Sequence, residues 1–482
     1  MKIVPDLYPS VIWRIATLAI AACLCLQVSA ATWYVDGTAN GANDGRSWAS
    51  AWTKLEAIRG LSAGDTVYIS GGPEGSSQTY RLMTPFTALP GFKQGKRGNP
   101  VIYRIGQEVE HRGTAVFSKS SGGGHFLSGP SYIEFSGDAG DGQMHFAIRG
   151  FYNLLTDPHS IDVRVTHVDC GEINRLAVLN PANGIELAYL YAKIIDPHAS
   201  NAIYCQFYGK TWDENSIHHC TILIPNSGNG LGSDGIAGGG AGWSLHDNTI
   251  EGYYLENARG NHQDGWQGLG GSFIKIYNNT FINIANYPIF GDARNGDFSH
   301  FRVYNNIILL TDAKIQASHP PQGIAIGPDG GVITGTKTGA LGRWPVFADV
   351  VVANNLIVDY GRQHGSINLR NNPRQHATFV DCIVANNLYV NSGGIGLDPA
   401  VSHSGNVGLT ARQAAKVLRQ YSPLAADNDL RLAEGALPAL ADGTNLTSYF
   451  KADKAGHSRP AEGAWTVGPY EARSDTVSSR SP

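Results

Sequence analysis

Apolar and polar residues alternate through the middle of the chain in a short phrase that recurs. Each copy has an apolar residue, a pair centred on asparagine, and then alternating apolar positions rich in Ile, Val, Tyr and Thr. The copies read "LHDNTIEGY", "IYNNTFINI", "VYNNIILLT", "VANNLIVDY" and "VANNLYVNS", with a weaker one at "IHHCTILIP". Alternation predicts strands rather than helices, and a repeat of about 20–50 residues predicts a solenoid.

The second asparagine of each phrase marks the repeat. These asparagines are Asn248, Asn279, Asn306, Asn355 and Asn387. One interval is longer than the others, so it holds either two short coils or one coil enlarged by a loop. Asparagines that stack at a sharp turn hydrogen-bond along the axis of a solenoid. The pattern predicts an all-β fold, a right-handed parallel β-helix.

A second phrase lies half a coil from the first and predicts which side chains point inward. The inward positions are Ile203, Ile236, Trp266, Ile289, Ile324, Ile367 and Ile395. Period-two alternation turns the following residues outward: Tyr204, Ala237, Gln267, Phe290, Ala325 and Asn368 one step on, and Gln206, Asp292 and Arg370 three steps on. This outward ladder is the candidate functional face.

Composition supports a β-rich protein. Glycine accounts for 59 of 482 residues, above its usual share of about 7%, and charged residues for only 16%, below the usual 25% or so. The net charge of −4 shows no basic stripe, which excludes a nucleic-acid binder. Four cysteines outside the N-terminal segment, Cys170, Cys205, Cys220 and Cys382, lack zinc-site spacing. They are buried thiols or include one disulfide.

The N-terminus resembles an export signal. Lys2 and Arg14 precede the apolar run "IATLAIAACLCLQ", and small residues end at Ala30, where we expect cleavage. The alternative is a lipoprotein processed at Cys23. The apolar run is too short to span a membrane as a helix, and no later segment qualifies. We therefore expect a secreted, periplasmic or cell-surface protein, and a monomer.

Both ends of the predicted solenoid need covers. At the N-terminal end, helical spacing of apolar residues at 48–58, after Ser47, predicts a capping helix. At the C-terminal end, "LTARQAAKVLRQY" predicts a helix capped by Thr410. The predicted layout is a signal peptide at 1–30, a cap and first strand at 31–72, the β-helix at 73–400, a C-terminal helix and capping segment at 401–472, and a disordered tail at 473–482.

The opening "WYVDGTANGANDG", "SWASAWTKL" and "AGDTVYISGG", with the close "DNDLRL", "LADG" and "WTVGPYEA", resembles secreted bacterial right-handed β-helix proteins of the pectate-lyase-like superfamily. The resemblance covers most of residues 31–472. It implies a chain that wraps back over the last coils. Members include polysaccharide lyases, glycoside hydrolases, epimerases and adhesins, so the resemblance implies a fold more than an activity.

We expect the chain to bind an extended polysaccharide and to cleave it as a lyase acting on a uronic-acid polymer. Such a reaction needs a cation for the carboxylate and a base. The predicted catalytic residues are His262 as the base, Asp264, Asp292, Arg294 and Arg370, with Asp264 and Asp292 also the candidate ligands of a Ca²⁺ ion. The predicted substrate-binding residues are Gln267, Arg259, Asn261, Tyr287, Phe290 and Asn368.

Two alternatives stay open. A hydrolase needs two carboxyl groups about 5–10 Å apart, and Asp234 and Asp264 occupy equivalent places on adjacent coils. A non-catalytic adhesive β-helix would scatter these residues among loops. Each Asp-Gly pair is also typical of a turn in which glycine takes a positive φ. We expect Gly265, Gly268, Gly270 and Gly271 to serve such a turn. The neighbours His218 and His219 are expected on opposite faces of a strand.

Overall fold

The computed structural model describes residues 30–119, 122–157, 159–228, 231–260, 262–293, 296–311, 323–328, 343–359, 365–371, 376–422, 427–433 and 440–472. The predicted signal peptide, except for Ala30, and the predicted tail at 473–482 lie outside these residues. Within the described part of the chain, no helix has the length and apolar character needed to cross a membrane.

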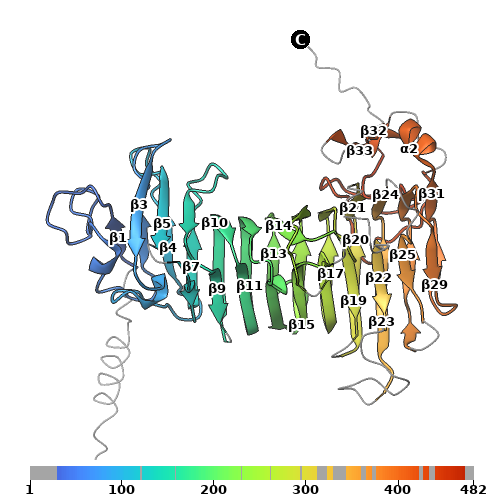
Figure 1. The fold of residues 1–482 in the computed structure, drawn as a ribbon, viewed down its shortest axis with the longest axis horizontal. Coiled ribbons are helices and arrows are strands. Elements are labelled where there is room, and N and C mark those ends of the chain that lie inside the picture. The colour runs from blue at the N-terminus through green and yellow to red at the C-terminus, as the bar shows by residue number, and fades with distance from the viewer. Residues whose placement is uncertain are drawn as a thin grey trace, which may run out of the picture.

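The chain winds into coils whose strands pair in parallel with the strands of the next coil, and the coils stack along the long axis of the molecule (Figure 1). The strands form three parallel sheets, and several strands turn a corner from one sheet into the next. Parallel crossovers are right-handed in almost all proteins. The predicted fold, a parallel β-helix, is confirmed.

Sheet 1 contains β6 (His125–Ser128), β9 (Asn153–Asp157), the start of β11 (Arg175–Ile194), β12 (Asn201–Tyr208), the starts of β15 (Asp234–His246) and β17 (Trp266–Tyr277), β19 (Ile289–Asp292), β22 (Ile324–Gly327), β25 (Ile367–Leu369) and β29 (Ile395–Leu397).

Sheet 2 contains β1 (Thr32–Val35), β2 (Thr66–Ile69), β4 (Val101–Ile105), β7 (Ser131–Ser136), the start of β10 (Ile161–Ile173), the middle of β11, β13 (Asn215–His218), the ends of β15 and β17, β20 (Phe298–Tyr304), β23 (Val346–Ala353), β26 (Thr378–Val380), β27 (Ile383–Ala385) and β30 (Ser402–Ser404).

Sheet 3 contains β3 (Ser77–Leu82), β5 (Thr114–Lys119), β8 (Phe146–Arg149), the ends of β10 and β11, β14 (Thr221–Asn226), β16 (Thr249–Tyr254), β18 (Thr280–Ile282), β21 (Ile307–Leu310), β24 (Leu356–Asp359), β28 (Leu388–Val390) and β31 (Val407–Leu409).

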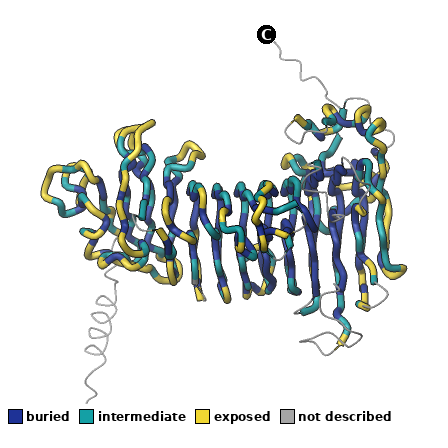
Figure 2. Tube along the Cα trace, in the orientation of Figure 1, coloured by how far each residue is buried: buried dark blue, intermediate teal, exposed yellow. Residues whose placement is uncertain are grey.

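The predicted inward ladder is confirmed by the register of sheet 1. Its seven residues pair in sequence from Ile203 to Ile395, and all but Ile395 are buried. They belong to one hydrophobic core that extends from Val35 to Val401, visible as the buried stretches of the strands in Figure 2. The outward ladder from Tyr204 to Asn368 pairs in the same register.

The asparagine ladder follows the corner between sheets 2 and 3. The side-chain amide of Asn248 donates to the amide oxygen of Asn279 at 3.0 Å, and the same bond continues in turn through Asn306, Asn355, Asn387 and Asn406. The bond from Asn306 to Asn355 is 2.9 Å long although the residues are 49 positions apart. The long interval therefore belongs to one enlarged coil.

The predicted N-terminal helix at 48–58 is wrong. Within it only Leu55–Ala57 forms a short 3-10 helix (η1); a second one, η2 (Phe86–Ala88), follows later. Trp52 is extended and forms a parallel bridge with Val35: its N–H donates to the Tyr34 carbonyl at 2.9 Å. Trp52, Leu55 and Ile58 are nevertheless buried. Their spacing reflects burial on the end of the solenoid, which an extended segment achieves as well as a helix.

The C-terminal helix forms but is shorter than expected. It is α2 (Ala411–Val417), and Thr410 and Gln413 make a reciprocal capping box. The next residues are extended as β32 (Leu418–Gln420), which pairs antiparallel with β33 (Asp429–Leu432). These elements lie at one end of the solenoid (Figure 1).

The segment at 440–472 packs on the corner between sheets 2 and 3. Asn354 donates to the carbonyls of Thr466 and Gly468, and Asn386 donates to the carbonyl of Thr444. Leu446, Phe450 and Trp465 pack on Val351, Ala353 and Ala385. The segment thus covers the last coils along this corner.

All four cysteines in the described part of the chain are buried and free. Burial raises the pKa of the Cys382 thiol to about 11 and that of Cys220 to about 12. The disulfide alternative is wrong, and the four thiols are core residues.

Candidate functional site

The segment at 262–264, just before β17, is anchored by a glutamine that the sequence did not single out. Gln263 is fully buried. Its side-chain oxygen accepts from the Asn226 amide at 3.1 Å and from the Ala285 N–H at 2.8 Å, and its amide donates to the Ile224 carbonyl at 3.0 Å. Because these contacts reach the coils on both sides, they fix the positions of His262 and Asp264.

Asp264 is inaccessible to solvent and belongs to a network across three coils. One carboxylate oxygen accepts from the Asn286 amide at 2.8 Å and from the Tyr287 N–H at 3.0 Å. The backbone N–H of Asp264 donates to the carboxylate of Asp234 at 2.9 Å. Asp234 and Asp264 are therefore stacked on adjacent coils, as their spacing predicted, and both are at most 2% exposed.

His262 lies over this carboxylate pair. Its Nδ1 is 3.3 Å from an oxygen of Asp234 and 3.1 Å from an oxygen of Asp264. The imidazole is 35% exposed, so it is the solvent-facing member of the cluster. Its other nitrogen, Nε2, is 3.5 Å from the side-chain amide of Gln267. We call Asp234, His262 and Asp264 the buried cluster.

Burial and pairing shift the titration of the buried cluster. Contact with the carboxylates of Asp234 and then Asp264 outweighs burial and raises the pKa of His262 to about 11. Burial raises the pKa of Asp234 to about 7, although His262 opposes the rise. The two carboxylates thus favour the protonated imidazole, and burial favours the protonated form of Asp234.

The outward ladder of sheet 1 passes beside this cluster at Gln267. Gln267, Phe290 and Asn368 are on its rungs. Phe290 is only 5% exposed because the Tyr287 ring stacks on it, with the centroids 4.7 Å apart. Tyr287, which is half-buried, is therefore the more accessible aromatic surface of the pair.

The structure does not bring Asp292 to the buried cluster. Asp264 is level with Tyr287 on the next coil, to which it is hydrogen-bonded, whereas Asp292 ends that rung. At about 3.3 Å per residue the two carboxylates lie roughly 16 Å apart along the strand direction. That distance is too long for one ion, so Asp264 and Asp292 do not form the predicted Ca²⁺ pair.

The predicted arginines are also spread out. Arg370 follows β25, three rungs beyond Trp266, which is about 14 Å along the stack. Arg370 and Arg259 are exposed, and Arg259 precedes His262 closely in sequence. Asn261 and Arg294 lie outside the described residues.

The ligand atoms of Asp234, His262 and Asp264 lie within 4.8 Å of one another, close enough for a metal ion. With His262 carrying its proton, the imidazolium itself takes the place of the cation between the two carboxylates. The cluster is thus complete as a salt-bridged unit, and a Ca²⁺ requirement remains a prediction.

Asp234 begins an Asp-Gly pair, which is typical of a turn, and no sequence motif pointed to Gln263 or Asn286. The expected turn geometry is also wrong for Gly265, because the chain does not take a positive φ there. A Cβ at Gly265 would lie 2.5 Å from the Pro288 carbonyl oxygen, so close packing requires the glycine. The positive φ occurs later, at Gly270 (104°), where β17 turns from sheet 1 into sheet 2. The sequence did offer one signal for Asp234: the equivalent position on each neighbouring coil also holds a polar residue.

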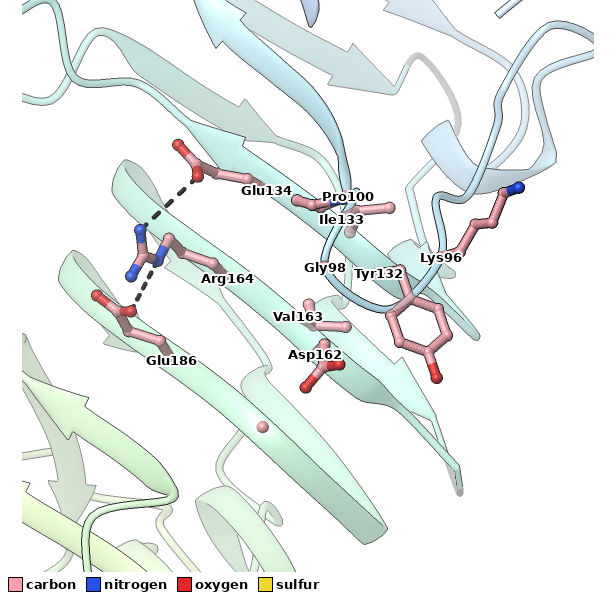
Figure 3. A pocket seen from close by; sticks show the side chains of 11 residues that line it. Lys96, Gly98, Pro100, Tyr132, Ile133, Glu134, Asp162, Val163, Arg164 and Glu186 are labelled. Atoms are coloured by element: carbon pink, nitrogen blue, oxygen red, sulfur yellow. Dashed lines mark hydrogen bonds and ion pairs between the residues drawn. The ribbon is translucent and has the colours of Figure 1, made fainter. Parts of the chain in front are cut away.

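A separate hollow of about 270 Å³ lies over sheet 2 near the N-terminal end, lined in part by Lys96, Glu134, Arg164 and Glu186 (Figure 3). The Arg164 guanidinium lies 2.7 Å from Glu186 and 3.7 Å from Glu134. The arginine is therefore held between two carboxylates of neighbouring coils. These ion pairs, which we call the charge ladder, link the coils, so Arg164 is not free to bind an anion in the hollow.

Comparison with solved structures gives low similarity. A pectate lyase is 12% identical with a TM-score of 0.37, over 92% of this chain and 96% of its own. An alginate lyase from Paenibacillus sp. is 13% identical with a TM-score of 0.31, over 74% of this chain and 95% of its own. The tailspike protein of E. coli bacteriophage HK620, solved with a pentasaccharide, is 14% identical with a TM-score of 0.37, over 72% and 60%.

Neither a protein-family model nor a curated protein sequence matches the chain. Because the TM-scores are low, the fold assignment rests on the parallel register and the asparagine ladder, and the site rests on its own geometry.

Proposed function

We propose that the chain is an exported carbohydrate-active enzyme, a polysaccharide lyase that cleaves a uronic-acid polymer. The observation that carries the proposal is the His262 imidazole, exposed on one side and held from below by two buried carboxylates. A carboxylate that orients an imidazole and shares its proton is the arrangement of a general base. Beside His262, the half-buried ring of Tyr287 is the aromatic surface on which we propose that a sugar stacks.

The buried cluster has the proton balance that elimination needs. When His262, whose pKa is raised to about 11, loses its Nε2 proton to water, the Nδ1–H stays on the carboxylates and the Nε2 lone pair can accept a proton. The C–H bond beside the uronate carboxylate breaks, its proton goes to Nε2, and its electron pair forms the C=C bond. The glycosidic C–O bond breaks with its electrons on the leaving oxygen, which takes a proton from water.

The substrate carboxylate needs a cation near His262. Arg259 is the candidate because it is close to His262 in sequence, and Arg294 remains a predicted catalytic residue. Arg370, about 14 Å along the stack, would bind another uronate of the same polymer. The predicted sugar contacts remain Asn261, Gln267, Tyr287, Phe290 and Asn368. Asp292, predicted as a catalytic residue and metal ligand, lies roughly 16 Å from Asp264 along the strand direction, so we propose neither role for it.

The hydrolase alternative fits less well. A hydrolase presents both carboxyl groups to the scissile bond, but Asp234 and Asp264 are at most 2% exposed and lie beneath His262. The adhesin alternative lacks a reason for a buried, proton-sharing cluster under an accessible imidazole.

The test incubates the purified chain with a panel of acidic and neutral polysaccharides. Unsaturated products, followed by their ultraviolet absorbance, report elimination, and reducing ends are measured in parallel. We expect unsaturated products from a uronic-acid polymer, lost in His262→Gln and retained in His403→Gln, a matched change at an exposed histidine of the last coils. Reducing ends without absorbance would indicate a hydrolase, and no product across the panel would favour an adhesin.

A further inference from the structure

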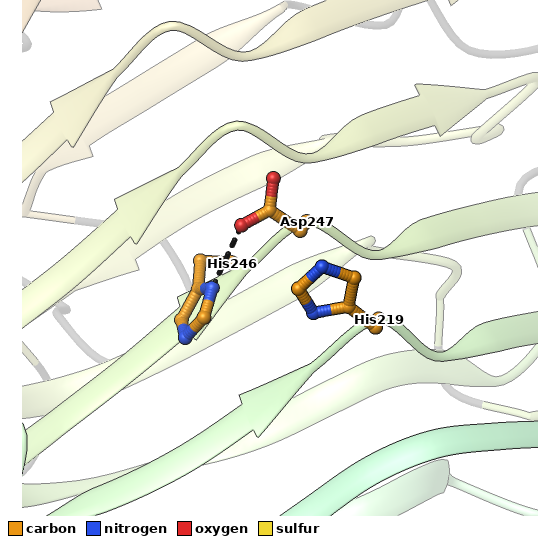
Figure 4. A group of neighbouring side chains, drawn as sticks. All are labelled: His219, His246 and Asp247. Atoms are coloured by element: carbon orange, nitrogen blue, oxygen red, sulfur yellow. Dashed lines mark hydrogen bonds and ion pairs between the residues drawn. The ribbon is translucent and has the colours of Figure 1, made fainter. Parts of the chain in front are cut away.

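A second group of metal-ligating side chains lies at the corner between sheets 2 and 3, away from the buried cluster. It consists of His219, His246 and Asp247, whose ligand atoms lie within 4.8 Å of one another (Figure 4). His246 ends β15 and Asp247 follows it, while His219 comes from the adjacent coil, just after β13. His219 is exposed, and His246 and Asp247 are half-buried, so an ion in solution can reach them.

The backbone of this corner does not require these side chains. His219 and Asp247 take a left-handed conformation with φ of 53° and 55°, and Asn278 and Asn305 take the same conformation on the next coils. Asparagine, aspartate and histidine all tolerate it. The next two coils carry Tyr-Asn at this place, as at Tyr277 and Asn278, whereas these two coils carry His-His and His-Asp. The substitution supplies donor atoms without a change of fold.

The expectation that His218 and His219 point to opposite faces is wrong. Because residue 219 is left-handed, the chain turns there, and the Nδ1 atoms of the two rings are 2.9 Å apart. His218 also lies 3.4 Å from Glu186 through its Nε2 and stacks on His246, with the centroids 4.7 Å apart. These contacts leave His218 as a support that orients the two histidines beside it.

The donor set identifies the class of ion. Nδ1 of His246 lies 2.8 Å from the Asp247 carboxylate, and the His219 ring is fixed by stacking on Tyr189 at 4.7 Å. Two imidazoles and one carboxylate suit Zn²⁺, Ni²⁺ or Cu²⁺, whereas Ca²⁺ prefers six to eight oxygen ligands. Lys454, which donates to the Asn278 carbonyl and interacts with Asp247, is the neighbouring positive charge and would limit the affinity.

We propose that His219, His246 and Asp247 bind one transition-metal dication of the Zn²⁺ type, which links two adjacent coils. Water fills the remaining coordination position in a tetrahedral arrangement. The site does not depend on the proposed lyase activity, because β15 separates it from the buried cluster at the other end of the strand.

The test is calorimetric titration of the purified, metal-stripped chain, without a histidine tag, with Zn²⁺, and with Ca²⁺ as the oxygen-seeking control. Variants His219→Asn and Asp247→Asn introduce the residue that the next coils carry at this position, so the corner is expected to keep its fold. We expect one Zn²⁺ per chain, weakened roughly tenfold or more in either variant, and a rise in Tm with Zn²⁺ that the variants lose.

The control variant His262→Asn removes the histidine of the buried cluster. Zn²⁺ binding that survives in this variant and is lost in His219→Asn supports the corner site. Binding that is lost in His262→Asn and unchanged in the corner variants, or no Zn²⁺ binding by the wild-type chain, would overturn the proposal. Circular dichroism of each variant confirms that the strands are retained.

Discussion

The two ends of strand β15 carry similar side chains in opposite surroundings. At its start, Asp234 lies beneath His262 together with Asp264, and both carboxylates are buried. At its end, His246 pairs with Asp247, whose side chain is 29% exposed. Histidine and aspartate therefore form a charged unit locked by burial at one end and an accessible donor set at the other.

The backbone explains the difference. The segment around Gln263 is held between neighbouring coils by buried hydrogen bonds, so Asp264 cannot reach solvent. His219 and Asp247 instead follow the last residues of their strands at a corner, where the left-handed turn directs them outward. Residue type alone therefore does not define a site in this fold, because the position on the coil decides how far a side chain is buried and which groups surround it.

The largest expected effect is on catalysis. His262→Gln removes the proposed base, and we expect kcat to fall about 10²- to 10⁴-fold. His246→Asn changes the other end of β15 and should leave the rate unchanged. Initial rates of unsaturated-product formation measure both. Equal losses of rate in the two variants would show that the buried cluster and the corner group do not differ in their role in catalysis.

The next effect is on stability. Asp264→Asn removes a fully buried carboxylate that pairs with the partly exposed His262, which is expected to cost about 3 kcal/mol of unfolding free energy. Asp247→Asn removes a partly exposed charge at a position that accepts asparagine, so the expected cost is below about 1 kcal/mol. Urea denaturation with a chelator present compares the two. If Asp247→Asn loses more unfolding free energy than Asp264→Asn, burial does not explain the difference between the two ends of β15.

Stability and activity are expected to change in opposite directions with pH at the buried cluster. The pKa of Asp234 is raised from 3.8 to about 7 and that of His262 from 6.5 to about 11, so the folded state binds more protons than the unfolded state. This stabilisation is complete below the unfolded values and is lost as pH rises through the folded ones. Activity should rise as pH increases toward about 11, where His262 loses its proton and becomes able to act as the base.

The measurement is the unfolding free energy of the wild type and of Asp234→Asn between about pH 5 and pH 9. The asparagine cannot ionise, so the variant should gain stability relative to the wild type as pH increases. A constant difference across this range would show that Asp234 has an ordinary pKa.

The smallest effect concerns the charge ladder of sheet 2, which leads from Glu134 through Arg164 and Glu186 to His218. Arg164 is 52% exposed, so Arg164→Met should cost less than about 1 kcal/mol. The midpoint of urea unfolding reports the change. A loss of unfolding free energy as large as that of Asp264→Asn would show that exposed ion pairs on this sheet contribute substantially to stability.

The repeat architecture was predictable because its signal is local and periodic. Alternation around Ile236, Trp266 and Ile289 is enough to define the register of sheet 1, and the asparagine pairs locate the corner. The N-terminal cap was not predictable in the same way. At 48–58 a helix and an extended chain packed against Val35 would bury the same apolar residues. Only the bridge between Val35 and Trp52 shows that the chain is extended.

The candidate site was predictable only in part. His262, Asp264 and Gln267 stood out because they are close together in sequence and in space. The role of Asp234 depends on stacking with the next coil, and that of Gln263 on bonds to both neighbours, which a linear motif does not contain. Asp292 was wrongly expected beside Asp264. The two residues lie on the same face of the solenoid but at opposite ends of their strands.

The hydrogen bond between Asn306 and Asn355 shows that one coil can grow by many residues while its neighbours keep their alignment. The additional residues lie between strands that keep their pairing with the neighbouring coils, so the stacked frame is undisturbed. A fold built this way separates the freedom to reshape a binding surface from the need to remain folded. Lengthening or replacing such an insertion is therefore a route to new specificity that leaves the rest of the spiral unchanged.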